Sequence, residues 1–279
     1  MSIIGFWSAS EKETGQTLAA TAFATYLGIK HNYRILLIDA TFHDDVMERC
    51  FWKINPNKDA ARKLNKGKVD ISSGAEGLVT AVASNKATPE IITNFTRVVL
   101  KNRLDVLCGL KTEIPEEFTK SLMLYKDLIT MANKYYDFVI VDIEKTLKKD
   151  TTKALLGAST LIVTDFTQNY KQFEEYFTAI TANKNIFTKD KLIPLLTNSD
   201  ENSKYNAKNV ARILKQKELN TVLYNPVFKD CASEASVANF FLRYGLSTTG
   251  NDKNTPFIKA LDELDKTIEY KLEELKYKY

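Results

Sequence analysis

The polar loop over residues 8–17 carries the residue types that could bind a phosphate group. It follows the apolar run Ile3–Trp7 and ends in Gly15, Gln16 and Thr17, where a helix-forming stretch begins. The start of a helix offers unpaired backbone N–H groups and the positive end of its dipole, and both attract anions. This arrangement is typical of a phosphate-binding unit of strand, loop and helix.

The loop departs from the phosphate-binding pattern G-x-x-x-x-G-K-[ST] at two fixed positions. Gly15 and Thr17 stand in register with the pattern, but Ser10 replaces its first glycine and Gln16 replaces its lysine. A glutamine amide can donate a hydrogen bond to a phosphate oxygen, but it cannot neutralise the charge of a transferring phosphoryl group. The sequence therefore predicts a phosphate-binding unit of strand, loop and helix whose loop lacks the positive charge used in phosphoryl transfer.

Two carboxylates end apolar runs elsewhere in the chain. Asp39 closes the run 34–39 and Asp142 closes the run 136–142. Thr17 stands in the first turn of the helix-forming stretch that follows the loop. Each residue also has an ordinary explanation, since Thr is tolerated in a first helical turn and a strand-terminal Asp often caps the next segment.

The elements that position these residues alternate between short apolar runs and helical patterns. A continuous apolar, β-branched run predicts a strand buried on both faces, as in a parallel sheet. We expect an α/β fold with a doubly wound, mostly parallel sheet of seven or eight strands, in one domain over residues 1–279. Strands are expected at 3–7, 34–39, 104–109, 136–142, 159–164, 191–197 and 221–224. Helices are expected at 16–30, 78–83, 115–134 and 256–279, with another beginning near Pro89.

Composition excludes several classes of protein. Lys and Arg number 39 against 35 Asp and Glu, and the excess is spread along the chain, which favours neither a nucleic-acid nor a membrane surface. Cys50, Cys108 and Cys231 lie far apart without a C-x-x-C pair, so their spacing indicates neither a disulfide framework nor a cysteine zinc site. With no signal peptide and no apolar run approaching the ~18 residues that span a bilayer, we expect a cytoplasmic protein.

Two segments leave alternatives open. Lysines and an arginine recur between Lys53 and Lys68, which is consistent with a nucleic-acid patch or, more simply, with a solvated surface insertion. The segment 256–279 repeats apolar residues at spacings of three and four with a mixed-charge polar face. That pattern favours a helix packed on the sheet over a partner-facing or membrane-surface helix.

Five segments, in order, resemble the ParA/MinD group of deviant-Walker-A ATPases. The resemblance covers nearly the whole chain and extends to the ends of four strands. Residues 34–39 look like the acidic A′ strand, 136–142 like the Walker B strand, 158–164 like the following aspartate-less strand, 195–198 like the strand end whose asparagine faces adenine, and 223–234 like the base-binding loop. The resemblance implies a homodimer that binds ATP or ADP with Mg²⁺.

The resemblance also implies a set of site residues. The expected nucleotide-binding residues are Lys12, Thr14, Gly15, Gln16, Thr17, Leu18, Asp39, Asn198 and Pro226, with Thr17 and Asp142 at the metal. Asn198 equally suits a plain turn, because Asn and Ser are common turn residues.

Departures from the family pattern decide how much function carries over. The signature lysine of the family falls at Glu11, its glycine pair at Lys12 and Glu13, and the second acidic residue of its A′ motif at Thr41. A threonine can orient a water molecule but is no substitute for a carboxylate in polarising it. The chain looks closest to the TadZ/CpaE branch, the localisation factors of pilus and secretion machines.

These features predict a positioning or assembly factor. We expect a dimerising scaffold or weak nucleotide-binding switch for a secretion, pilus or partitioning machine, recruited to a pole or membrane complex and binding ATP or ADP with Mg²⁺ or no nucleotide. The alternatives are an active Mg·ATP-hydrolysing dimer switch and a non-specific DNA-binding partition protein, which would bind DNA less tightly as salt rises.

Overall fold

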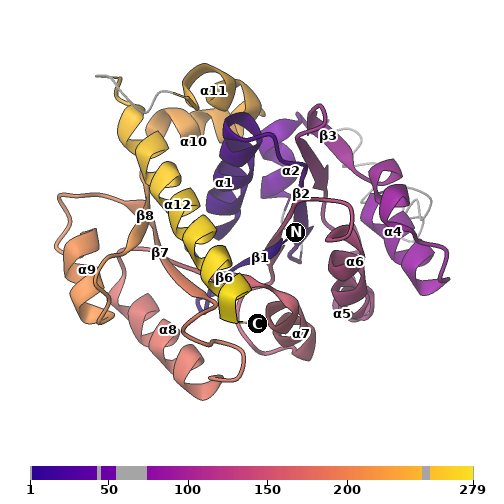
Figure 1. The fold of residues 1–279 in the computed structure, drawn as a ribbon, viewed down its shortest axis with the longest axis horizontal. Coiled ribbons are helices and arrows are strands. Elements are labelled where there is room, and N and C mark those ends of the chain that lie inside the picture. Colours follow the sequence, from indigo (N-terminus) through magenta and orange to yellow (C-terminus); the bar gives the residue numbers. More distant parts are fainter. Residues whose placement is uncertain (1, 43–44, 55–73, 247–251, 279) are drawn as a thin grey trace.

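The computed structural model describes residues 2–42, 45–54, 74–246 and 252–278, and its centre is one eight-stranded sheet (Figure 1). The strand order is β3-β4-β2-β5-β1-β6-β7-β8, and every neighbouring pair is parallel except β3 with β4. The strands are β1 (Ser2–Trp7), β2 (Ile35–Ala40), β3 (Arg97–Leu100), β4 (Leu104–Leu107), β5 (Phe138–Ile143), β6 (Leu161–Phe166), β7 (Leu192–Ser199) and β8 (Asn220–Leu223). The predicted doubly wound, mostly parallel α/β sheet is confirmed.

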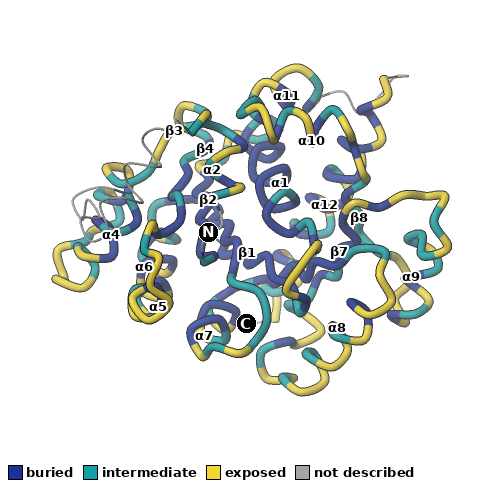
Figure 2. The backbone as a smooth tube through the Cα atoms, turned by 180° about the vertical axis from the view of Figure 1, so that it is seen from behind, coloured by how far each residue is buried: buried dark blue, intermediate teal, exposed yellow. Residues whose placement is uncertain are grey.

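Helices cover both faces of the sheet, which explains why the central strands are uniformly apolar. β1, β2, β5 and β6 are buried along their whole length, and Figure 2 shows the buried backbone at β1 and β2. One face packs against α1 (Gln16–Lys30), α2 (Val46–Phe51), α10 (Pro226–Ser233), α11 (Val237–Tyr244) and α12 (Thr255–Lys278). We call it the α1 face.

The opposite face is covered by a second group of elements. They are α4 (Gly74–Ala83), the 3₁₀ helix η1 (Pro89–Asn94), α5 (Pro115–Met123), α6 (Tyr125–Ala132) and α7 (Asp150–Ala158). A smaller apolar cluster lies under α8 (Tyr170–Ala182) and α9 (Ala207–Ile213).

Two details differ from the sequence expectation. The single helix expected over 115–134 is two helices, because the chain breaks at Leu124, whose N–H bonds to the Ser121 carbonyl in a 3₁₀ turn. β6 continues past Thr164 to Phe166, so the strand expected to lack an aspartate contains Asp165.

The C-terminal helix packs on the sheet, as its periodicity predicts. α12 contacts β8 and α1, and its apolar side chains are buried as far as Leu272. Within the described ranges, no helix combines the length and apolar character that crossing a membrane requires. The lysine-rich segment that follows Lys53 lies outside the described residues.

Candidate functional site

The phosphate-type loop is closed at its end by Gly15, which needs a left-handed backbone. Its φ is 67°, and a Cβ at this position would meet Thr197 and Asn198 of β7 at 3.0–3.1 Å. The Thr197 hydroxyl donates to the carbonyl oxygen of Thr14 and lies 3.1 Å from that of Phe166. Glycine is therefore required both by the backbone angle and by the close approach of β7.

The outer side of the loop is held by α8 and by the loop after β5. Ser10 donates to Glu175, and the Gln172 amide donates to the Lys12 carbonyl oxygen at 3.3 Å. Glu11 pairs with Lys148, which lowers the pKa of that carboxyl through a hydrogen bond and charge attraction. The side chains of Glu11, Lys12 and Glu13 are all exposed, so the two glutamates do not point into the loop.

Gln16 is turned into the protein at the position of the missing lysine. Its side chain is 1% exposed. Its Nε2 donates to Asp142 Oδ1 at 2.5 Å, to the Ile143 carbonyl oxygen at 2.7 Å and lies 3.2 Å from that of Phe6. The amide thus ties the first turn of α1 to the carboxyl ends of β1 and β5.

Three carboxylates lie at the carboxyl edge of the sheet on the α1 face. Asp39 and Asp142 are register partners on β2 and β5, and Asp165 lies on β6 at a position that alternates with Val163, whose side chain packs on that face. Asp39, Asp142 and Asp165 are at most 2% exposed. We call them the carboxylate cluster.

Asp165 is a candidate functional residue that the sequence patterns do not single out. Burial raises the pKa of Asp165 well above its ordinary value and the charge of Asp142 raises it further, while Lys145 and the Trp7 backbone N–H act in the opposite direction. Neither of its oxygens makes a hydrogen bond of normal geometry within the described structure. The available signal was its place at the end of an apolar run, which it shares with Asp39 and Asp142.

Asp39 accepts two hydrogen bonds from Thr41, two residues further along the chain. Its Oδ1 accepts from the Thr41 N–H at 3.0 Å and from the Thr41 hydroxyl at 2.7 Å. A Cβ added to Gly109 would meet Asp39 Oδ2 at 2.8 Å, so that side is closely packed. In this arrangement the Thr41 hydroxyl orients Asp39 rather than a water molecule.

The remaining predicted residues divide between the loop and more distant positions. Thr14 and Thr17 are buried beside Gln16, whereas Leu18 is half-buried and packs against the apolar core. Asn198 is exposed with a φ of 49° and lies over Gly15. Pro226 is exposed in the first turn of α10, so its part in the site stays a prediction.

The site offers oxygen donors to a hard cation but no side-chain positive charge from Gln16 to a phosphate. The Thr14 hydroxyl and Gln16 Oε1 are buried oxygens that lack a hydrogen-bond partner among the described residues, and the carboxylate cluster adds negative charge. Oxygen donors of this kind suit Mg²⁺, with Thr17 and Asp142 as the residues that would hold it. A triphosphate would face the same carboxylates without the cation that normally compensates its charge.

Comparison with known proteins reveals the fold but no close relative. No family model matches the chain, and no curated protein sequence matches it. A ParA family ATPase from Chlorobium tepidum has a similar structure at 17% identity, with a TM-score of 0.68 over 93% of this chain and 98% of that one.

Two further solved structures agree with this assignment. The cell division ATPase MinD from Pyrococcus furiosus is 15% identical, with a TM-score of 0.66 over 95% of this chain and 99% of that one. A putative plasmid partition protein from Borrelia burgdorferi, bound to AMPPNP, is 17% identical, with a TM-score of 0.63 over 97% and 99%. The chain therefore has the fold of the ParA and MinD ATPases.

Proposed function

We propose that this protein is a positioning or assembly factor built on the ParA/MinD fold, with a phosphate loop that has lost its catalytic charge. It acts as a homodimerising scaffold, or as a weak nucleotide-binding switch, for a secretion, pilus or partitioning machine. The TadZ/CpaE branch is the proposed affiliation, because its members localise such machines and some lack a complete phosphate loop. Proteins of known structure with this fold include a plasmid partition protein and a cell division ATPase.

The hydrogen bonds of Gln16 are the observation that supports a scaffold over an efficient ATPase. The neutral amide occupies the lysine position and donates to Asp142, the residue expected to hold the water shell of Mg²⁺. Binding a metal at Asp142 therefore competes with this hydrogen bond. The same amide offers a phosphate no positive charge. The attraction lost with the lysine ammonium is about 4 kcal/mol at most, for two unit charges about 4 Å apart at an effective dielectric constant near 20.

The loop can still bind ATP or ADP with Mg²⁺ weakly. The first turn of α1 presents backbone N–H groups behind a glycine in the left-handed conformation, and this is a favourable setting for an anion. Bound Mg²⁺ would neutralise part of the phosphate charge, held by Thr17 and Asp142. Gly15, Gln16, Thr17 and Asn198 surround this position and are the proposed nucleotide-binding residues, with Lys12, Thr14, Leu18, Asp39 and Pro226 around them.

The variant Gln16→Lys tests the proposal by restoring the missing charge. We expect it to bind Mg·ATP at least tenfold more tightly than the wild type in isothermal titration calorimetry, because an ammonium group attracts the phosphates directly. Gln216→Lys is the matched control, since it adds the same charge at an exposed position between α9 and β8.

The wild type supplies the decisive comparison. Mg²⁺-dependent ATP turnover that rises above background in the wild type and is abolished by Asp142→Ala would contradict the scaffold and support an active hydrolytic switch. Lys145 would then be the first residue to test as the replacement cation, because its positive charge acts on Asp165 and lowers the pKa of that carboxyl. Salt-sensitive binding to duplex DNA would instead support the partition alternative.

A further inference from the structure

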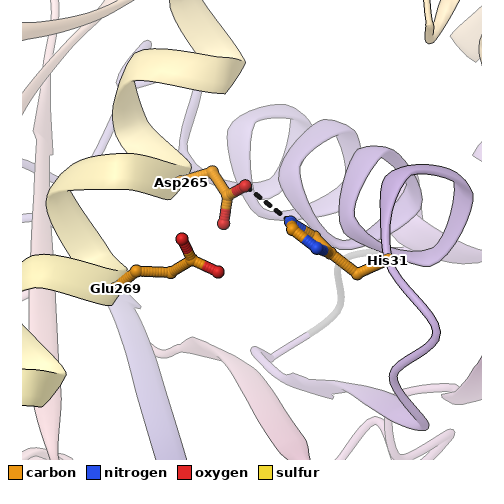
Figure 3. Close-up of side chains that lie close together, drawn as sticks. All are labelled: His31, Asp265 and Glu269. Carbon is orange, nitrogen blue, oxygen red and sulfur yellow. Dashed lines mark hydrogen bonds and ion pairs between the residues drawn. The ribbon is translucent and has the colours of Figure 1, made fainter.

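A second group of potential ligands lies away from the phosphate loop, where α1 meets α12. It consists of His31, Asp265 and Glu269, and we call it the α1–α12 cluster (Figure 3). His31 Nε2 lies 2.8 Å from Asp265 Oδ2, and one ligand atom from each of the three residues lies within 4.8 Å of the other two. Imidazole nitrogen and carboxylate oxygen are both ligand types that divalent transition metals accept in proteins.

Helix geometry brings the three side chains together. His31 is the C-terminal cap of α1, while Asp265 and Glu269 are one turn apart on α12 and therefore project from the same side of that helix. The carboxyl end of a helix carries a partial negative charge, which favours a cation beside His31. The cluster would thus join two helices that are distant in sequence.

Tyr33 orients two of the three ligands. Its ring stacks on that of His31 with centroids 4.8 Å apart and planes 27° apart. Its hydroxyl donates to Glu269 Oε1 at 3.4 Å. Outer contacts of this kind hold imidazole and carboxylate ligands in position and raise the affinity of metal sites.

Lys30 already pairs with Asp265 of the cluster, and it shares a second carboxylate, Asp262, with Lys266. Lys30 contacts Asp262 at 2.6 Å and Asp265 at 2.8 Å, and Lys266 contacts Asp262 at 2.6 Å. Lys30 can therefore release Asp265 and keep Asp262 when another cation enters. Arg103 donates to the carbonyl oxygen of His31 and not to its imidazole.

We propose that the α1–α12 cluster binds one divalent transition-metal ion such as Zn²⁺, and that this ion links the C-terminal helix α12 to α1. The contact of His31 Nε2 with Asp265 would give way to a bond from Nε2 to the ion, with the imidazole neutral and its proton on Nδ1. Asp265 and Glu269 would each contribute one carboxylate oxygen, and solvent would complete the coordination. Access is available because the His31 side chain is 21% exposed. The spacing of the cysteines gives no hint of this site, because its ligands include none.

Calorimetric titration of the EDTA-stripped full chain with ZnSO₄ tests the proposal. We expect one ion per chain and a melting temperature that rises with zinc. Glu269→Gln keeps the size of the side chain but removes the anionic ligand, and we expect it to weaken binding by roughly tenfold or more. Glu273→Gln, one turn further along α12 and exposed, should bind zinc like the wild type.

Spectra with Co²⁺ separate this site from adventitious binding to the three cysteines. The proposal predicts a spectrum of nitrogen and oxygen ligands in the wild type, lost in His31→Gln, with folding checked by circular dichroism. A thiolate charge-transfer band would overturn the proposal. Equal zinc affinity of the two glutamate variants, or no saturable binding by the wild type, would overturn it as well.

Discussion

At the scale of single residues, the site combines a neutral amide with a carboxylate cluster. Gln16 bonds to Asp142, and Thr41 bonds to Asp39, so two of the three carboxylates are stabilised by hydrogen bonds. Asp165 has no such bond of normal geometry among the described residues. Burying a charged carboxyl in this way is costly, so the protonated form is favoured.

The raised pKa of Asp165 has a definite consequence for stability against pH. Below its unfolded value of 3.8, both states carry the proton. Above that value the unfolded chain releases the proton while the folded protein still holds it, so the free energy of unfolding falls as pH rises towards the folded pKa.

We therefore expect Asp165→Asn to stabilise the protein progressively more as pH rises. Thermal melts in EDTA at pH 4.5 and 7.5 should show a larger gain in melting temperature over the wild type at pH 7.5. Asp127→Asn, on the exposed side of α6, is the control and should show no such trend. An equal gain at pH 4.5 and pH 7.5, or a gain that shrinks towards pH 7.5, would contradict a raised pKa of Asp165 in the folded protein.

At the scale of elements, apolar runs were sufficient to predict the central strands but not the edge strand β3. β5 and β2 read as continuous apolar segments because helices cover both of their faces. β3 was missed because it is a short, partly exposed edge strand whose pattern is not distinct from a loop. The break at Leu124 was missed because the helical periodicity continues through it on both sides.

The candidate site was predictable in part. Gly15, Thr17, Asp39 and Asp142 were found from spacing and from their places at strand and helix ends. Asp165 was missed because the family pattern led us to expect a strand without an aspartate. The inward direction of Gln16 depends on the path of the whole loop, which no local pattern encodes.

The ion pairs between α1 and α12 make a contribution to folding stability that can be tested. Lys30 bridges Asp262 and Asp265, and Asp265 is 2% exposed. Desolvation raises the pKa of Asp262, but hydrogen bonds from Lys266, Lys30 and Tyr26 outweigh it and hold that pKa well below its usual range. Asp262 therefore stabilises the fold at neutral pH, and this contribution is lost only as pH falls through that low folded value.

Removing Lys30 should destabilise the protein more than removing its neighbour Lys266. Lys30→Met leaves the buried carboxylate of Asp265 with the His31 contact alone, and we expect a loss of about 1–2 kcal/mol in urea unfolding. Lys266 is 68% exposed, so Lys266→Met should cost less than about 0.5 kcal/mol. Equal losses would mean that the bridge to Asp265 contributes nothing.

At the scale of the whole molecule, the sheet topology gathers the site at one edge. Seven strands run parallel, so the ends of β1, β2, β5, β6 and β7 meet around the first turn of α1. Glu11, Lys12 and Glu13 are exposed on the loop at the same edge, where the proposed dimer would bring two copies together. The chain thus has the sheet topology of the ParA and MinD ATPases, while the residue at the lysine position of the phosphate-binding pattern is a neutral glutamine.

The oligomeric mass of the wild type in the presence and absence of nucleotide tests this account most directly. Light scattering of the purified full chain, with Mg·ATP, with Mg·ADP and without nucleotide, should give the same mass in all three conditions. Gln16→Lys should be the variant whose dimer fraction depends on nucleotide, with the dimer favoured by Mg·ATP. A wild type that becomes a dimer only when Mg·ATP is added, at nucleotide concentrations near those of the chain, would contradict the claim that the loop has lost its driving charge.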